Sequence, residues 1–292
     1  MEKTGIVTDS HSSITQKQAK ELGIFVLPMP FYINNICYYE DVTLSRDEFF
    51  KKLNNGADIT TSQPAPAQVM EYWDRALESY EQILYIPISS GLSGSCATAY
   101  AMAQEPPYKD RVFVVDNGRV STPLYCTILD ALDLIARGYR AGEIRDLLEK
   151  YRDKMVIYIG VDTLEHLKKG GRITPAAAAI GSVLNIKPVL RFDVGTLEPF
   201  KKCRGFQKAK KVMLEAMHHD LTTRFADWYE KGDFHLLAAS SSTKEATERW
   251  VEEIRASFPG IQVISGDLSL GVSSHIGYGG LGIGCSCKPR TP

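Results

Sequence analysis

Short apolar runs alternate with amphipathic stretches in the first half of the chain. The apolar runs predict strands, and the helical spacing of apolar positions between them predicts helices. Strands are expected at residues 5–8, 24–31, 83–88 and 112–115, and helices begin near Thr15, Ser45, Pro66, Ser95, Thr122 and Glu143. Such alternation favours a parallel α/β sheet. Pro28 and Pro30 indicate that the second strand lies at an edge.

The pattern changes after Asp153. Strands are expected at residues 156–161, 189–192, 197–202, 236–239 and 262–264, with helices at 164–169, 208–218 and 244–258. The residues Asp193–Thr196 predict a hairpin turn between two of these strands. We therefore expect an N-terminal α/β domain with a Rossmann-like parallel sheet over residues 1–153, and a C-terminal mixed α+β domain over residues 154–292. Residues 288–292 are expected to form a disordered tail.

Two hydroxyl-rich loops carry most of the candidate chemistry. Thr60–Pro64 and Ser89–Ser95 each follow or interrupt an apolar stretch and lead into a predicted helix. A helix N-terminus presents free backbone N–H groups and a partial positive charge, and serine and threonine hydroxyls add further donors. Asp9, Ser93 and Asp116 also fall at or just beyond the carboxyl ends of predicted strands, where open α/β sheets bind ligands. The loops therefore predict a site for an anionic group that needs no metal ion.

Familiar catalytic motifs are incomplete in this chain. Residues 277–282 have the glycine spacing of a dinucleotide-binding loop, but neither the helix nor the acidic residue of that motif follows. Ser93 lies in a sequence that resembles a nucleophile elbow, yet Ser95 stands where the second glycine belongs. His275 has no acidic residue beside it, which disfavours a serine hydrolase. We expect no catalytic residue, and His275 is a candidate for binding because hydroxyls and glycines surround it.

A further candidate lies in the segment 164–172. Lys168 and Lys169 end a short predicted helix, where the helix dipole favours cations. Two glycines follow and turn the chain before Arg172. A guanidinium group can form two parallel hydrogen bonds with a phosphate or a carboxylate. We therefore expect Arg172 at the mouth of the site.

Composition narrows the classes of function. The 292 residues carry a net charge of −1, and no basic stripe or polybasic tail indicates nucleic acid or an anionic membrane surface. The six cysteines lack the spacing of a zinc site and are expected to be reduced thiols. No apolar run approaches the roughly 20 residues of a membrane span, and the first residues lack the pattern of a signal peptide. We expect a cytoplasmic protein without a metal or cofactor.

Six segments, in order over nearly the whole chain, resemble the DegV family of bacterial fatty-acid-binding proteins. They are Ile6–Ser10, Thr61–Pro64, Ile88–Ser95, Leu167–Ile173, Ile186–Leu190 and Gly271–Gly284. The resemblance implies a two-domain fold with a long-chain fatty acid, of the palmitate, stearate or oleate class, bound between the domains. It also implies a ligand-binding subunit without its own catalytic nucleophile.

The resemblance assigns the binding residues as well. It implies that hydroxyls of the two N-terminal loops, those of Thr61 and Ser93, hold the carboxylate, with Ser62, Gly94 and His275 at the same polar site. Family members of the fatty-acid-kinase type present the carboxylate to a separate ATP-dependent kinase subunit. That subunit forms acyl phosphate for phospholipid synthesis.

Three residues bear on how far the resemblance extends. Arg172 is suited to the encounter with the kinase subunit. Ala65 stands where the family usually has serine, and Pro123 stands where it has glycine, near a wall that borders the acyl tail. The residues also leave two alternatives: a stand-alone phosphotransferase or hydrolase acting on a small polar substrate, and a regulator that senses bound lipid.

Overall fold

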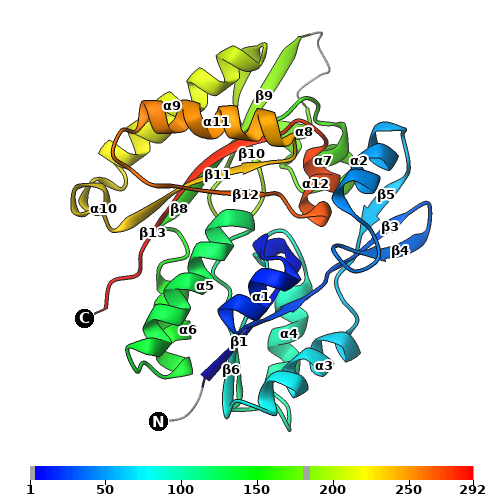
Figure 1. The fold of residues 1–292 in the computed structure, drawn as a ribbon, viewed down its shortest axis with the longest axis vertical. Coiled ribbons are helices and arrows are strands. Elements are labelled where there is room, and N and C mark those ends of the chain that lie inside the picture. Colours follow the sequence, from blue (N-terminus) through cyan, green and yellow to red (C-terminus); the bar gives the residue numbers. More distant parts are fainter. Residues whose placement is uncertain (1–3, 180–184, 292) are drawn as a thin grey trace.

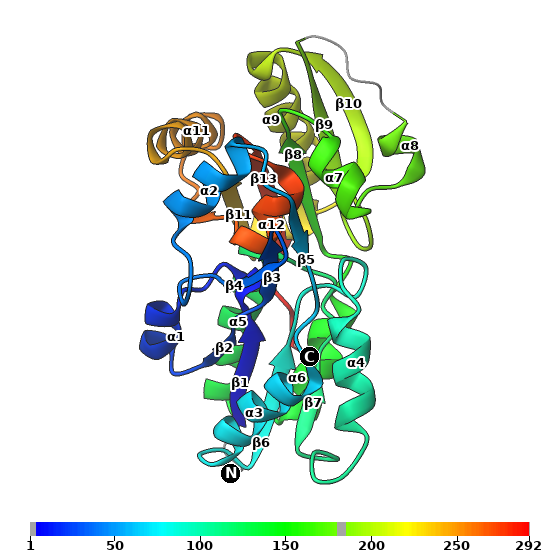
Figure 2. The same ribbon diagram turned by 90° about the vertical axis from the view of Figure 1, so that its right-hand side faces the viewer.

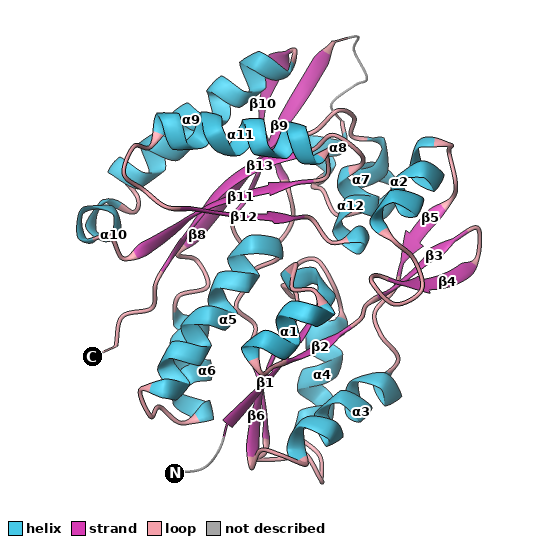
Figure 3. Cartoon of the chain, in the orientation of Figure 1, coloured by secondary structure: helices cyan, strands magenta, loops and turns pink. Residues whose placement is uncertain are grey.

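Three β-sheets organise the chain in the computed structural model, which describes residues 4–179 and 185–291. A four-stranded and a six-stranded sheet follow one another along the long axis of the molecule, and a three-stranded sheet lies beside their junction (Figure 1; Figure 2). Helices pack around both larger sheets (Figure 3).

The four-stranded sheet is parallel and has the strand order β2-β1-β6-β7. Its strands are β1 (Thr4–Asp9), β2 (Phe25–Leu27), β6 (Gln82–Ile86) and β7 (Val112–Val114). One face packs against α1 (Gln16–Leu22), α5 (Ser121–Ala136) and α6 (Ala141–Lys150). The other face packs against α3 (Pro66–Leu77) and α4 (Ser95–Ala103). The predicted parallel α/β sheet is confirmed.

The six-stranded sheet is mixed, with the strand order β10-β9-β8-β13-β11-β12. Its strands are β8 (Met155–Gly160), β9 (Ile186–Phe192), β10 (Glu198–Arg204), β11 (Phe234–Ser240), β12 (Val263–Asp267) and β13 (Leu281–Cys287). Helices α9 (Phe206–Thr222) and α11 (Lys244–Ser257) bury its outer face around Trp250. The opposite face is directed toward the four-stranded half of the molecule, and α5 contacts β11, β12 and β13 there.

The three-stranded sheet has the order β4-β3-β5, with β3 (Pro30–Ile33), β4 (Ile36–Tyr39) and β5 (Ile59–Thr61). Asn34 and Asn35 form its hairpin turn with φ values of 50° and 65°, as the type I′ turn requires. The sheet and α2 (Arg46–Asn54) share an apolar core with Leu270, the first residue of α12 (Leu270–Ile276). This packing connects the N-terminal half to the helix that carries His275.

Two expectations about the chain are wrong. Residues 24–31 do not form one edge strand: the chain leaves the parallel sheet at Pro28, so that β2 is an edge strand while β3 is the middle strand of another sheet. Pro30 is tolerated there because it is the first residue of β3. Residues 288–291 are not a disordered tail, since Arg290 pairs with Asp227 and Asp233, and residue 292 lies outside the described residues.

Several short elements complete the chain: α7 (Glu165–Gly170), α8 (Pro175–Ala178), α10 (Ala226–Lys231) and a 3₁₀ turn, η1 (Ser10–Ser12). The hairpin turn expected near Asp193 joins β9 to β10 and is confirmed. The division into domains near Asp153 stays a prediction; β8, the first strand of the six-stranded sheet, begins at Met155. Within the described residues, no helix combines the length and the apolar character that crossing a membrane requires.

Candidate functional site

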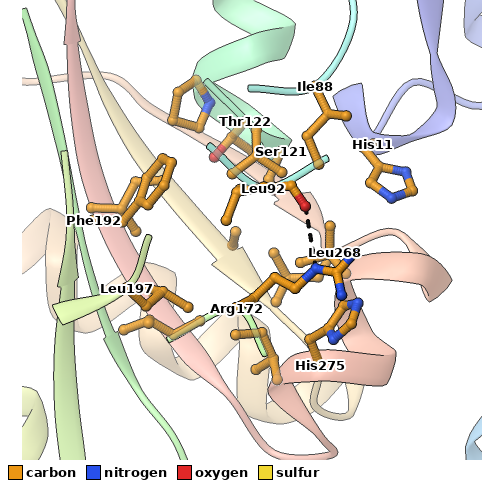
Figure 4. A pocket seen from close by; sticks show the side chains of 18 of the residues that line it. His11, Ile88, Leu92, Ser121, Thr122, Arg172, Phe192, Leu197, Leu268 and His275 are labelled. Atoms are coloured by element: carbon orange, nitrogen blue, oxygen red, sulfur yellow. Dashed lines mark hydrogen bonds between the residues drawn. The ribbon is translucent and has the colours of Figure 1, made fainter. Parts of the chain in front are cut away.

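A cavity lies between the two larger sheets, where strand ends of the parallel sheet face the inner side of the six-stranded sheet (Figure 4). It contains about 950 Å³ of space between the atoms, a figure that includes the open solvent at its mouth. Its wall is mainly apolar, with Ile157, Ile159 and Phe192 on the six-stranded sheet and Ile88 and Leu92 on the N-terminal half. Among the described lining residues, Arg172 is the one with a permanent charge.

The polar end of the cavity combines side chains from separate elements. Thr61 lies at the end of β5, and its Oγ1 is 3.0 Å from Nε2 of His275 on α12. Ser93, in the loop before α4, has its Oγ 3.0 Å from Oγ of Ser95 and accepts a hydrogen bond from the Ser95 backbone N–H at 3.3 Å. Thr61, Ser62 and Ser93 all line the cavity. The two predicted hydroxyl loops therefore meet at one end of it.

Arg172 extends into this end from the segment after α7, beside His275 (Figure 4). Its Nε donates to the carbonyl oxygen of Leu92 at 3.2 Å, and its Nη1 donates to the carbonyl oxygen of Gly170. None of the ion pairs found among residues 4–179 and 185–291 includes Arg172, and no acidic side chain among them lines the cavity. A positive charge without an acidic partner favours an anion at this position.

Two histidines near Arg172 are held neutral. Burial, followed by the charge of Arg172, lowers the pKa of His275 to about 3 and that of His11 to about 4. Neutral imidazole can donate one hydrogen bond and accept another. At neutral pH the positive charge of the polar end therefore comes from Arg172, while His275 and Thr61 supply neutral hydrogen-bonding groups.

Glycines make room for the histidine rings. A Cβ atom at Gly170 would overlap the ring of His275, and one at Gly271 would come within 2.7 Å of Cε1 of His11. These contacts join α7 to α12, and α12 to the turn after β1. The two glycines before Arg172 therefore have different roles. Gly170 leaves space for the His275 ring, and Gly171, with a φ of 68°, ends α7 in the left-handed conformation.

Asp9 organises the loops behind the site. Its two carboxylate oxygens accept the backbone N–H groups of His11, at 2.9 Å, and of Ile88, at 2.8 Å. Burial raises the pKa of Asp9 to about 6 although both hydrogen bonds lower it. A single side chain therefore fixes the ends of β1 and β6, from which His11 and Ile88 reach the cavity wall.

The turn between β9 and β10 contacts the two loops that follow β6 and β7. A Cβ atom at Gly91 would overlap the backbone of Gly195, and one at Gly118 would come within 3.3 Å of the Val194 side chain. The hydroxyl-rich loop Ser89–Ser95 therefore packs directly against the β9–β10 hairpin. Only glycine permits so close an approach of two backbones.

A second, more polar hollow adjoins the polar end. It shares Thr61, Arg172 and His275 with the cavity and is also lined by His166 and Lys169. Lys169 pairs with Asp58 at its rim. The polar end of the cavity thus adjoins a hollow of different character, which contains about 570 Å³ of space between the atoms, open solvent included.

Comparison with known proteins identifies the family. The model of the family described as "Uncharacterised protein, DegV family" matches residues 3–288. The chain belongs to the DegV family. A DegV domain-containing protein from Halalkalibacterium halodurans is 30% identical over 288 residues, which cover 97% of this chain and 98% of the other.

Two solved DegV structures share the fold. A DegV family protein from Thermus thermophilus, described by its fatty acid binding, has a TM-score of 0.85 and 30% identity, over 98% of this chain and 99% of the other. DegV from Bacillus subtilis, described as a fatty acid binding protein, has a TM-score of 0.84 and 27% identity, over 99% of this chain and 100% of the other. The two sheets of this DegV chain are therefore those of the family.

The structure brings most of the predicted site residues of this DegV chain together. Thr61, Ser62, Ser93, Arg172 and His275 all line the cavity, whereas Gly94 is not among its lining residues and precedes α4 as its N-cap. The roles expected of them stay predictions.

Sequence reasoning missed other wall residues of this DegV site. They are His11, Ser121 and Thr122. The position of His11 just after the first strand was the available signal, because that is the edge at which open sheets bind ligands. Pro123, expected near the wall, does line the cavity.

Proposed function

We propose that this chain binds a long-chain fatty acid in the cavity between its two larger sheets. The observation that supports this most directly is the contrast along the cavity. Apolar side chains form most of its wall, and one end holds hydroxyls and Arg172, which has no acidic partner among the described residues. A fatty acid has the same contrast. The two related structures described as fatty acid binding, at 30% and 27% identity, support the same ligand class.

The carboxylate is assigned to the polar end. Thr61 and Ser93 supply hydroxyls from the two N-terminal loops, and His275 bonds to Thr61 at 3.0 Å. Hydrogen bonds to a charged group contribute about 1.5–3 kcal/mol each. In the described wall no acidic residue opposes the carboxylate.

The acyl tail supplies most of the affinity. Each buried methylene contributes roughly 0.8 kcal/mol, so a chain of about 16 to 18 carbons contributes about 12 kcal/mol before the ordering costs of binding are subtracted. The headgroup then determines orientation and specificity more than strength.

The chain acts as a binding subunit, and a separate ATP-dependent fatty acid kinase phosphorylates the carboxylate. Two features support this part of the proposal. Arg172, Thr61 and His275 lie where the cavity meets the polar hollow, so that the carboxylate is approached from that side. The described wall also holds no serine or cysteine paired with a base and an acid in the way that covalent catalysis requires.

Native mass spectrometry of the purified protein tests the ligand. We expect a mass excess equal to a C16 or C18 fatty acid, and release of that acid by organic extraction. Recovery of no lipid, together with no binding of added palmitate or oleate, would contradict the proposal.

Arg172→Ala tests the partner. We expect this variant to bind fatty acid more weakly, because the carboxylate loses its nearby cation, but still to hold it at saturating concentration. We expect it to lose acyl phosphate formation even then, when a fatty acid kinase subunit and ATP are supplied. Arg172→Lys is the matched control, because it keeps the charge but not the fork of donors. Equal loss of lipid and of transfer would place Arg172 in lipid binding alone.

A further inference from the structure

The inner face of the six-stranded sheet has a gap in its row of side chains. On this face Ile159 of β8 pairs with Gly282 of β13, and Gly282 pairs in turn with Ala239 of β11. The next row places Ile157 beside Gly284. Because strand residues opposite one another point to the same face, side chains at 282 and 284 would stand between those of the neighbouring strands. All five of these residues line the cavity.

The two glycines lie at different depths. Gly282 comes seven positions after His275, and Gly284 lies two residues further along β13. The row of Gly284 continues through Ile157 to Phe192, and Phe192 lies across the cavity from His275 (Figure 4). Gly282 is therefore nearer the polar end and Gly284 nearer the far end.

Gly282 has room for a side chain as far as the protein itself is concerned. A Cβ atom there would meet the carbonyl oxygens of Ala239 and Tyr158 at 3.5 and 3.6 Å and Cγ1 of Ile159 at 3.8 Å, which are ordinary contacts. At Gly284 the fit is tighter, with the carbonyl oxygen of Val156 at 3.0 Å. Packing within the sheet does not explain the glycine at 282, whereas a ligand lying over it does.

We propose that Gly282 and Gly284 form the floor on which the acyl tail lies, and that the residue at 282 determines how long a chain is accepted. This inference rests on the proposed binding of fatty acid. A methyl group at 282 reduces the space available to every chain that reaches this row, and leaves shorter chains unaffected. A methyl group at 284 acts only on chains that extend deeper.

Relative affinities for saturated acids of 10 to 18 carbons, measured by competition in one equimolar mixture, test the inference. For Gly282→Ala we expect the preference for the C18 over the C10 acid to fall about tenfold, the effect of overfilling a packed wall by one methyl group. For Gly284→Ala we expect the decline to begin at a longer chain. Gly142→Ala on α6 is the matched control, since its Cβ atom would meet only the Phe113 ring, at 3.4 Å, and Gly142 is not among the lining residues.

Compensation separates a cavity effect from a folding effect. Ile159→Val removes one methyl group beside Gly282, and we expect the double variant Gly282→Ala/Ile159→Val to regain preference for the longer acids. If Gly282→Ala does not fold, Ala239→Val narrows the same row from the other side and carries the same expectation. An unchanged length profile, or equal weakening at every length, would overturn the inference. Failure of the unaltered protein to bind any of the acids would instead contradict the proposed function.

Discussion

The two larger sheets contribute to the cavity in different ways. The parallel sheet contributes the ends of its strands, where the turn after β1 carries His11 and the loop after β6 carries Ser93. The six-stranded sheet contributes a face, with Ile157, Ile159 and Phe192 exposed to the cavity. Strand ends carry loops with free backbone groups, whereas a sheet face has its backbone groups paired and presents side chains alone.

This difference explains how one cavity can have two chemistries. The hydroxyl groups gather where strands end, joined there by Arg172 after α7 and His275 on α12, and apolar groups gather where strands run side by side. The three-stranded sheet adds Thr61 to the polar end through the last residue of β5. A ligand with a charged head and an apolar tail therefore fits with its head at the strand ends and its tail along the face.

The largest expected effect on binding comes from the face of the six-stranded sheet that lines the cavity. Shortening the ligand from stearate to decanoate removes eight methylenes, and we expect a loss of up to about 6 kcal/mol of binding free energy. Competition binding to the delipidated protein measures this difference. Similar affinities for the two acids would mean that the tail does not lie along the six-stranded sheet.

The next effect concerns the strand ends. Thr61→Val and Ser93→Ala each remove one hydroxyl, and we expect each to weaken fatty acid binding by about 1.5–3 kcal/mol. The corresponding fatty alcohol, which has no carboxylate, should lose affinity for the unaltered protein and be less sensitive to these substitutions. Unchanged affinity in the folded double variant would remove both hydroxyls from the carboxylate site.

Sequence patterns predicted the helices around the parallel sheet better than the face of the six-stranded sheet that lines the cavity. Strong apolar periods and capping boxes such as Thr15 with Gln18 determine helices locally, and α1 begins with that capping box. β13 escaped recognition because Leu281–Cys287 contains two glycines and two cysteines and is buried on both faces, so no alternation of apolar and polar residues marks it.

The candidate site shows the same limit. Thr61 and Ser93 could be found because hydroxyl-rich loops before helices are a local signal. The neighbourhood of Arg172 and His275 could not be derived from spacing, since 103 positions separate them and α7 and α12 must pack before they meet. Gly170 leaves the space for this contact, and its role could not be predicted because it depends on how the two helices pack in the folded protein.

A smaller effect concerns how the stability of the folded chain depends on pH through His275, at the polar end of the cavity. Burial and Arg172 lower the pKa of His275 from 6.5 to about 3 in the folded chain. The unfolded chain therefore binds an extra proton as the pH falls below about 6.5, so the contribution of His275 to stability is present above this value and is lost on acidification. We expect His275→Gln to reduce the pH dependence of the unfolding free energy between pH 6.5 and 4 by at most about 1.4 kcal/mol per pH unit. Denaturant unfolding of both delipidated proteins measures it, and identical slopes would contradict the assignment.

The smallest effect separates stability from fatty acid binding within the segment that follows β5. Ala65 is the N-cap of α3, where its backbone N–H donates to Oε1 of Gln68 at 3.2 Å but its side chain caps nothing. Ala65→Ser adds the hydroxyl that completes a capping box, and we expect about 1 kcal/mol of added stability in denaturant unfolding. Ala65 is exposed and is not among the residues that line the cavity. Its substitution should therefore leave fatty acid affinity unchanged, in contrast to that of Thr61 four positions earlier. A change in affinity comparable to that of Thr61→Val would mean that the whole loop, and not its cavity-facing hydroxyl, determines how the carboxylate is held.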